Sequence, residues 1–299
     1  LRQAGGKAKV VAGGTSLTLT KDSGVEVLVD LSRAGLDAMT QKKGTLSIGA
    51  CVTARELAGA PELASPALRA LRDASKTAGP SGVRAALTIG GNVVQCYPWS
   101  DLPVALLALG ARVQITGNEP RKIALTDLLE RHPSKTLETD EIVEEFSLPL
   151  GGGDDTLVGS AFVKLSRTTT DYALATAAAW VKLREQTPAV PSDGEDEDPA
   201  TGFAVEDLRI ALGAVRPMPV AIEGLQSLTQ EGKANPTEAW IEKAGEVVLA
   251  QVGPIADMRA TVEHRNQLIK VASTRALREA VARATDGRAS SGDAHRATD

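Results

Sequence analysis

The chain contains very little cysteine. Cys51 and Cys96 are its only cysteines among 299 residues, and no C-x-x-C pair occurs. A disulfide framework, a zinc finger or an iron–sulfur cluster needs more cysteines at closer spacing, so these kinds of site are excluded. The two thiols could form one bridge, but so low a count is more typical of a reduced compartment, and we expect a cytoplasmic protein.

The chain also lacks an excess of positive charge and any long apolar run. It has 33 Lys and Arg against 38 Asp and Glu, a formal net charge of −5, and no stripe of basic residues that would displace counterions from nucleic acid. No apolar stretch reaches the roughly 18 residues that a membrane-spanning helix needs. We therefore expect a globular protein with neither a nucleic-acid partner nor a transmembrane segment, long enough for two or three units with their own cores.

Familiar catalytic and nucleotide-binding motifs are absent as well. Neither G-x-G-x-x-G nor G-x-x-x-x-G-K-[ST] occurs. No combination of Ser, Cys and His suggests nucleophilic catalysis, and no cluster of His, Cys, Asp and Glu suggests metal ligands. We assign no catalytic side chain and no metal site.

Two glycine turns are the clearest positive features. The first lies in VVAGGTSLTLT, residues 10–20, and the second in LTIGGNVVQ, residues 87–95; each follows a strand-like run. Glycine would serve a plain turn by supplying positive φ. Alternatively, the backbone N–H groups of two such turns could hold one diphosphate from both sides. The residues of the two turns leave both interpretations open.

Short β-branched runs and amphipathic runs alternate along the rest of the chain. Thr53 and Glu56 match a capping box at the start of a helix. The final helix should place Leu268, Val271, Leu277 and Val281 on one side. This mixture predicts an α+β fold. Strands are expected near residues 8–11, 25–31, 45–52, 87–90, 112–116, 141–150, 160–167 and 207–215, and helices near 53–63, 65–79, 101–111, 126–131, 221–228, 237–251 and 264–284.

Three blocks carry a family resemblance: VAGGTSL, then GVRAALTIGGN followed by Pro98, Ser100, Asp101 and Leu102, then AFVKLSRTTTDYALATAAAWV. In order and spacing they resemble the flavin-binding subunits of molybdenum hydroxylases, which include the FAD domain of xanthine dehydrogenase and the medium subunit of carbon monoxide dehydrogenase. The resemblance implies a PCMH/VAO-type FAD-binding domain of two subdomains, residues 1–35 and 36–155. A C-terminal α/β domain with a small antiparallel sheet and helices would follow at 156–285, with a mobile acidic loop at 188–202 and a disordered tail at 286–299. We expect the native N-terminus to lie upstream of Leu1.

The same resemblance implies the cofactor site. Arg84 takes the place of an arginine usual before the second loop; by itself it would be a surface charge at a helix end. Ser100 and Asp101 match the region near the ribityl chain, although both are also good helix caps. Lys164 matches a lysine near the flavin ring, Asp171 and Tyr172 match an acid and an aromatic residue beside it, and Val143 matches an apolar contact. The two pyrophosphate loops would comprise Val10, Val11, Ala12, Gly13, Gly14, Thr15, Ser16 and Leu17, and Thr88, Ile89, Gly90, Gly91 and Asn92.

The resemblance implies an oxidoreductase subunit that binds FAD and transfers electrons. A large partner would carry the molybdenum cofactor and a small partner two 2Fe-2S clusters, in a dimer of heterotrimers; the final acceptor is not specified. One alternative is a stand-alone FAD-dependent reductase similar to the enolpyruvyl-UDP-N-acetylglucosamine reductase, and another is a flavin-free scaffold. The stretch CYPW, residues 96–99, is bulkier than the family pattern, so Tyr97 or Trp99 could shield the flavin or meet a partner.

Overall fold

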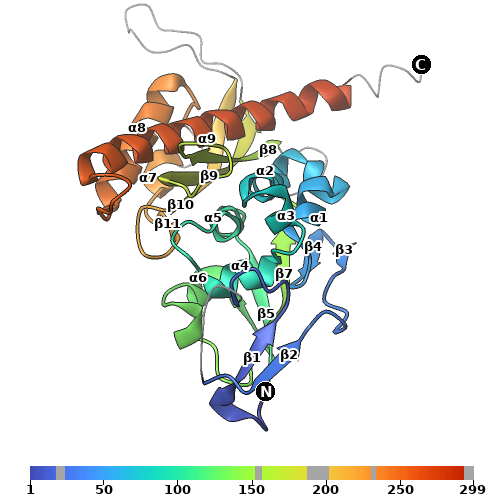
Figure 1. Ribbon diagram of the computed structural model, residues 1–299. Coiled ribbons are helices and arrows are strands. Elements are labelled where there is room, and N and C mark those ends of the chain that lie inside the picture. Colours follow the sequence, from blue (N-terminus) through green and yellow to red (C-terminus); the bar gives the residue numbers. More distant parts are fainter. Residues whose placement is uncertain (18–23, 152–156, 187–201, 230–233, 293–299) are drawn as a thin grey trace, which may run out of the picture.

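The structure is a computed structural model that describes residues 1–17, 24–151, 157–186, 202–229 and 234–292. Its helices and strands are mixed along the chain and form three sheets, which confirms the α+β class. Figure 1 shows the small N-terminal sheet at one end of the molecule and the long helix α9 across the other. Apart from Gly202, the acidic stretch predicted to be a mobile loop lies outside the described residues.

The N-terminal sheet has two parallel strands, β1 (Ala8–Val11) and β2 (Val27–Asp30), preceded by the short 3-10 helix η1 (Gly5–Lys7). Neither strand has a fully buried residue, and Leu28 is 60% exposed. A pair of strands with so little buried surface is not expected to be stable alone. This sheet therefore depends on the contacts that the following turns make with the rest of the chain.

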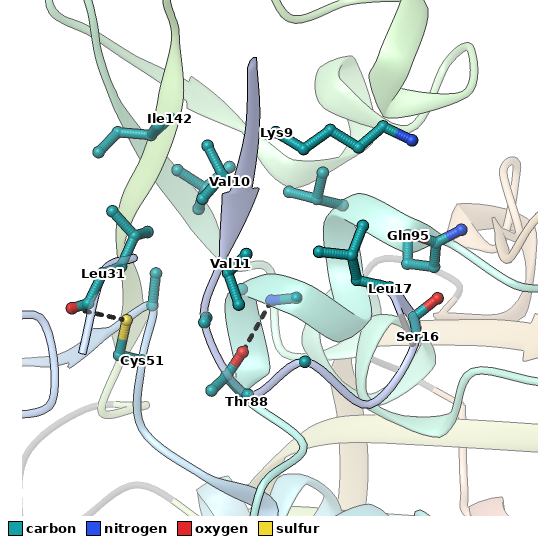
Figure 2. Close-up of a pocket in the computed structure, with 18 of the residues that line it drawn as sticks. Lys9, Val10, Val11, Ser16, Leu17, Leu31, Cys51, Thr88, Gln95 and Ile142 are labelled. Carbon is teal, nitrogen blue, oxygen red and sulfur yellow. Dashed lines mark hydrogen bonds between the residues drawn. The ribbon is translucent and has the colours of Figure 1, made fainter. Parts of the chain in front are cut away.

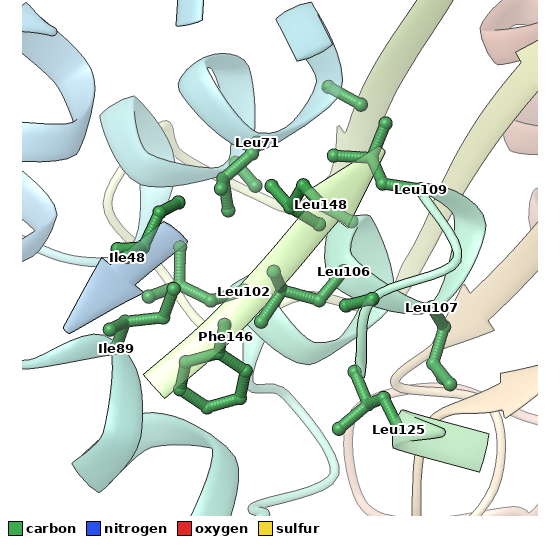
Figure 3. Packing of buried hydrophobic residues seen from close by; sticks show 14 of the residues in the cluster. Ile48, Leu71, Ile89, Leu102, Leu106, Leu107, Leu109, Leu125, Phe146 and Leu148 are labelled. Carbon is green, nitrogen blue, oxygen red and sulfur yellow. The ribbon is translucent and has the colours of Figure 1, made fainter. Parts of the chain in front are cut away.

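The second sheet has five antiparallel strands in the order β3-β4-β7-β5-β6. Leu46, Ile48 and Phe146 on its strands pack against Leu102 and Leu106 of helix α5, in the core that Figure 3 shows. All eight residues of α5 are buried, and those after Asp101 are all apolar, as expected for a helix that is covered on every side. The elements are β3 (Met39–Lys42), β4 (Thr45–Gly49), β5 (Arg112–Thr116), β6 (Arg121–Ala124), β7 (Ile142–Pro149), α1 (Ala54–Gly59), α2 (Arg69–Thr77), α3 (Ser81–Arg84), α4 (Ile89–Gln95), α5 (Asp101–Ala108) and α6 (Leu125–Leu128), with 3-10 helices η3 (Pro61–Ala64), η4 (Pro66–Leu68) and η5 (Pro133–Lys135).

The C-terminal part contains a four-stranded antiparallel sheet in the order β11-β10-β9-β8, with α9 lying over it. The alanines of β9 are fully buried and Gly159 lets α9 approach closely, since a Cβ there would lie 2.0 Å from the carbonyl oxygen of Ala280. Small residues thus set the distance between helix and sheet. The elements are β8 (Leu157–Leu165), β9 (Ala175–Glu185), β10 (Phe203–Gly213), β11 (Val220–Ala221), α7 (Gln226–Thr229), α8 (Glu238–Gln251) and α9 (Val262–Gly292).

Several sequence predictions are corrected by the structure. The second glycine turn was predicted to follow a strand, but residues 89–95 form helix α4. The helix predicted at 221–228 is shorter, because Ala221 pairs in β11 and α7 begins at Gln226. Val271 is 36% exposed instead of facing the core. Helix α9 continues to Gly292, so the first part of the predicted disordered tail is helical. The capping box of Thr53 and Glu56 is confirmed.

Candidate functional site

The first glycine turn leaves β1 and packs against a distant part of the chain. A Cβ on Gly13 would lie 1.5 Å from the carbonyl oxygen of Ala86, and Gly14 has a φ of +68°. Both glycines are therefore needed by the protein's own packing and backbone conformation. Within the described part of the chain, the backbone N–H groups of Ala12, Gly13 and Thr15 donate no hydrogen bond to protein. The turn thus presents backbone donors that an anion could use.

The second glycine pair lies in the first turn of α4. Thr88 caps this helix, and its Oγ1 accepts from the Gly91 N–H at 3.1 Å. The Gly90 N–H donates to the Ala50 carbonyl at 2.8 Å, and a Cβ on Gly90 would lie 2.7 Å from the Ala50 Cβ. Unlike the first turn, this pair has its donors engaged by protein. It contributes a close-packed helix N-terminus whose dipole favours a negative charge.

A cleft with two chambers runs along these turns. One chamber, about 330 Å³, lies between the first turn and α4 on one side and residues such as Leu31 and Ile142 on the other, as Figure 2 shows; we call it the apolar chamber after these two side chains. The other chamber, which we call the polar chamber after its buried residues Asp101 and Lys164, has a volume of about 400 Å³ and extends toward β8 and the residues that follow it. The two chambers share four lining residues, so they meet at the glycine turns: Thr15, Ser16, Gly91 and Gln95.

A buried ion pair lies in the polar chamber. Lys164 Nζ is 2.9 Å from Asp101 Oδ2, and these two side chains are 7% and 1% exposed. Lys164 also donates to the Thr77 carbonyl at 2.9 Å, and the Thr77 hydroxyl donates to Asp101 Oδ2 at 3.2 Å. Burial raises the pKa of Asp101 to about 6, against the opposing effect of the Lys164 ammonium. The chamber therefore holds the Lys164 side chain beside a carboxyl group whose pKa is raised to about 6.

Three buried oxygens of the same chamber have no hydrogen-bond partner within the described residues: Asn92 Oδ1, Ser100 Oγ and Asp101 Oδ1. Ser100 occupies the N-cap position of α5, but its side chain makes no capping hydrogen bond. Buried polar atoms are normally paired, so three unpaired oxygens on residues that line one chamber favour a polar ligand close to them. The capping role that the sequence allowed for Ser100 is thus not the one seen.

An aromatic wall, formed by Tyr97, Trp99 and Tyr172, lines the polar chamber. Tyr97 and Trp99 stack with ring centroids 5.1 Å apart, and Trp99 and Tyr172 lie 4.7 Å apart in a tilted arrangement. The Tyr97 hydroxyl is 2.8 Å from Ser16 Oγ, which joins this wall to the first glycine turn. The guanidinium of Arg259 lies over Trp99 and Tyr172, 4.9 and 5.3 Å from their ring centroids.

The structure brings the predicted site residues together around this cleft, with two exceptions. Arg84 ends α3 and donates to the Gly79 carbonyl at 2.7 Å, and Ile89 is fully buried in the core. Cys51 and Arg259 were not predicted; Cys51 lines the apolar chamber. The others line one chamber or the other: Val10, Val11, Ala12, Gly13, Gly14, Thr15, Ser16, Leu17, Thr88, Gly90, Gly91 and Val143 the apolar one, and Asn92, Ser100, Asp101, Lys164, Asp171 and Tyr172 the polar one.

The described residues contain no group of three or more His, Cys, Asp or Glu that could hold a metal ion. Both cysteines are free thiols. None of the helices in the described ranges has the length and apolar character to cross a membrane. The cleft combines an apolar chamber, a first glycine turn with free backbone donors and a chamber with unpaired oxygens and the Lys164 side chain. This arrangement suits a long ligand with an aromatic end, a diphosphate and several hydroxyl groups.

Comparison with known proteins leads to the same ligand. Residues 1–151 match the family model described as the FAD binding domain in molybdopterin dehydrogenase, and residues 160–280 match the CO dehydrogenase flavoprotein C-terminal domain. The carbon monoxide dehydrogenase medium chain of Hydrogenophaga pseudoflava is 29% identical, with 95% of this chain and 92% of the relative covered. The xanthine dehydrogenase FAD-binding subunit of Escherichia coli O157:H7 is also 29% identical, with 93% and 90% covered.

Solved structures agree in fold. Carbon monoxide dehydrogenase from Hydrogenophaga pseudoflava superposes with a TM-score of 0.79 at 28% identity, covering 94% of this chain and 92% of that one. Quinoline 2-oxidoreductase from Pseudomonas putida 86 gives a TM-score of 0.76 at 25% identity, with 93% and 90% covered. The family model that matches residues 1–151 covers half of this chain. The chain therefore belongs to the family of FAD-binding domains of molybdopterin dehydrogenases.

Proposed function

We propose that this chain is the FAD-binding, electron-transferring subunit of a molybdenum-containing hydroxylase or dehydrogenase complex. The observation that carries the proposal is the two-chambered cleft, with its glycine turns at the neck and unpaired oxygens in the polar chamber. FAD has a matching sequence of parts: adenosine, diphosphate, ribityl chain and isoalloxazine ring. The names of the relatives, a carbon monoxide dehydrogenase medium chain and a xanthine dehydrogenase FAD-binding subunit, support the same role.

The residues of the cleft fit FAD chemically. The free N–H groups of Ala12, Gly13 and Thr15 suit the diphosphate, together with the N-terminal turn of α4. Asn92 Oδ1 and Asp101 Oδ1 suit the ribityl hydroxyls, because a carbonyl or carboxylate oxygen accepts what a hydroxyl donates. We assign the apolar chamber to the adenosine part and the polar chamber to the ribityl chain and the ring.

Bound FAD can exchange electrons singly with iron–sulfur clusters and in pairs with a final acceptor. The side chains of this protein would hold and tune the cofactor. Lys164 places a positive charge in the polar chamber, which favours an anionic reduced ring, and Asp101 limits that charge as its carboxyl ionises. The aromatic wall of Tyr97, Trp99 and Tyr172 would exclude water from one side of the chamber.

The partners belong to this proposal too. We infer a heteromeric complex with a large subunit that carries the molybdenum cofactor and a small subunit with two 2Fe-2S clusters, assembled as a dimer of heterotrimers. Residues 1–35 and 36–155 would be the two FAD-binding subdomains, and 156–285 the C-terminal domain. The first subdomain contains β1 and β2, the second contains the five-stranded sheet, and the C-terminal domain contains the four-stranded sheet.

Titration of the purified, flavin-depleted chain with FAD tests the proposal directly. We expect binding at one FAD per chain, measured by the change in flavin fluorescence, and about fivefold weaker binding for Asn92→Ala, which removes one buried acceptor. Asn118→Ala is the matched control, because Asn118 is exposed and outside the cleft. A chain that binds no FAD would overturn the proposal and leave a flavin-free scaffold.

Isolation from the native host tests the subunit role. Co-purification of two further subunits with molybdenum and iron is the expected result. An FAD-loaded chain that purifies alone and reduces a substrate would instead indicate the stand-alone reductase.

A further inference from the structure

The aromatic wall is tied to the C-terminal part of the chain through the backbone of Pro98. The Ala214 N–H donates to the Pro98 carbonyl at 2.7 Å. Pro98 lies between Tyr97 and Trp99, so this bond fixes the segment that carries both rings. Ala214 has a φ of +61°, a conformation that a residue with a Cβ adopts only when its surroundings hold it there.

A tight turn at residues 257–260 carries Arg259, whose guanidinium lies over the aromatic wall. Asp257 Oδ1 accepts from the backbone N–H of Arg259 at 2.9 Å and of Ala260 at 3.2 Å. These bonds fix the backbone of the turn that carries Arg259, whose guanidinium covers Trp99 and Tyr172. Such a cation above an aromatic face is attracted to the ring and also contributes positive charge beside the chamber.

The buried guanidinium of Arg265 contacts both Ala214, which holds Pro98, and Asp257, which holds the turn with Arg259. Arg265 of α9 is 2% exposed; its Nη1 donates to the Ala214 carbonyl at 2.5 Å, and its Nη2 donates to Asp257 Oδ1 at 2.9 Å. Its Nε is buried and has no partner within the described part of the chain. Burying a charge with one donor unpaired is unfavourable. Packing α9 against the sheet therefore does not by itself account for an arginine at position 265.

We propose that Arg265 is a positioning residue for the polar chamber, which it does not itself line. Its fork holds Ala214, and through Ala214 the segment with Tyr97 and Trp99. The same fork holds Asp257, and through Asp257 the turn that carries Arg259. The segment that carries Tyr97 and Trp99 and the guanidinium of Arg259 above the wall are thereby fixed relative to each other by a single side chain. That the ligand of the chamber is FAD rests on the proposed function; the positioning of the wall does not.

Arg265→Lys is the test, because an ammonium cannot reproduce the planar fork that spans two acceptors. Arg283→Lys is the matched control: Arg283 lies on the same helix and its Nη1 contacts the Ser160 carbonyl and Asp73, each at 2.7 Å, away from the cleft. Trp99 provides a readout without flavin, because Trp180 and Trp240, the other two tryptophans, are buried. We compare quenching of tryptophan fluorescence by acrylamide, then FAD affinity and the flavin midpoint potential.

In Arg265→Lys we expect Trp99 to become about twofold more accessible to acrylamide and FAD to bind about tenfold more weakly, as for one lost charged hydrogen bond. The midpoint potential should shift, while Arg283→Lys matches the wild type in all three measurements. If Arg265→Lys does not fold, Asp257→Asn replaces it, because it weakens the same turn from the exposed side.

The positioning role is overturned if Arg265→Lys has the same quenching, FAD affinity and midpoint potential as the wild type. The same result in Asp257→Asn overturns it where that variant is needed. Equal changes in Arg283→Lys would also overturn it, since they would reflect general loosening of α9. A wild-type chain that binds no FAD would refute the proposed function, whereas the quenching experiment on the flavin-free protein would still decide the role of Arg265.

Discussion

Replacing Asp101 with asparagine should change how the stability of the flavin-free protein depends on pH. The carboxyl group is 2% exposed, and burial raises its pKa from the ordinary 3.8 to about 6 despite the nearby Lys164 ammonium. The folded state therefore binds this proton more tightly than the unfolded chain does. The stability that Asp101 contributes is fully present below pH 4 and is lost as the pH rises toward 6.

The expected magnitude follows from the shift. A difference of about two pKa units corresponds to about 3 kcal/mol in the free energy of unfolding. Asparagine does not titrate, so the difference in unfolding free energy between the wild type and Asp101→Asn should fall by about this amount between pH 4 and pH 7. The constant part of the difference depends on how well asparagine replaces the carboxylate as an acceptor for Lys164, and it cancels from the comparison.

Urea unfolding of the flavin-free wild type and the variant at several pH values between 4 and 7 measures this difference. Asp257→Asn is a control for which the pH dependence of the stability difference should have the opposite sign. Burial acts to raise the pKa of Asp257, but hydrogen bonds from the Arg259 backbone and the Arg265 guanidinium outweigh it and leave the pKa lowered. Its stabilising effect should therefore be lost as the pH falls. A difference for Asp101→Asn that grows with pH would show that the attraction of Lys164 outweighs burial, and would refute the reasoning.

Three further predictions concern the cleft. FAD at a hundred times its dissociation constant should slow the alkylation of Cys51 about a hundredfold, because Cys51 lines the apolar chamber. Mass spectrometry measures the labelling at alkaline pH, since burial raises the pKa of this thiol. The buried Cys96 should remain unlabelled throughout, and equal Cys51 labelling with and without FAD would contradict the assignment of the apolar chamber. Gly13→Ala should destabilise the protein by about 1–3 kcal/mol in urea unfolding and weaken FAD binding, since the new Cβ would clash with Ala86; unchanged values would mean that the turn can move freely. Thr88→Ala should cost about 1 kcal/mol through loss of the α4 cap, and a cost near zero would show that the cap is dispensable.

Local signals explain what the sequence predicted well. The capping box of Thr53 and Glu56 depends on residues three apart, and the first glycine turn follows directly from its strand. The helix at the second glycine pair was missed because glycine and β-branched valine both lower helix propensity. Its existence depends on tertiary contacts, above all the close approach of Gly90 to Ala50.

The site was predicted where the family motifs lie and missed where distant segments meet. Tyr97 and Trp99 were noted as bulky, but their stacking and the cation over them require Arg259, far along the chain. A Cβ added to Gly13 or Gly90 would face protein backbone or side chain, so the protein's own packing requires glycine at both positions, which no local pattern reveals. Arg265 gives no signal in an amphipathic pattern, because a buried arginine looks like any other charged residue of a helix.

The weakly packed N-terminal sheet has a consequence for the life of the protein in a cell. Its two strands bury little, and the cleft lies between the turn after β1 and the rest of the chain. A ligand seated there fastens the two sides together, and its contribution to stability grows with its free concentration. The supply of flavin would then govern how often this end of the chain opens to proteases.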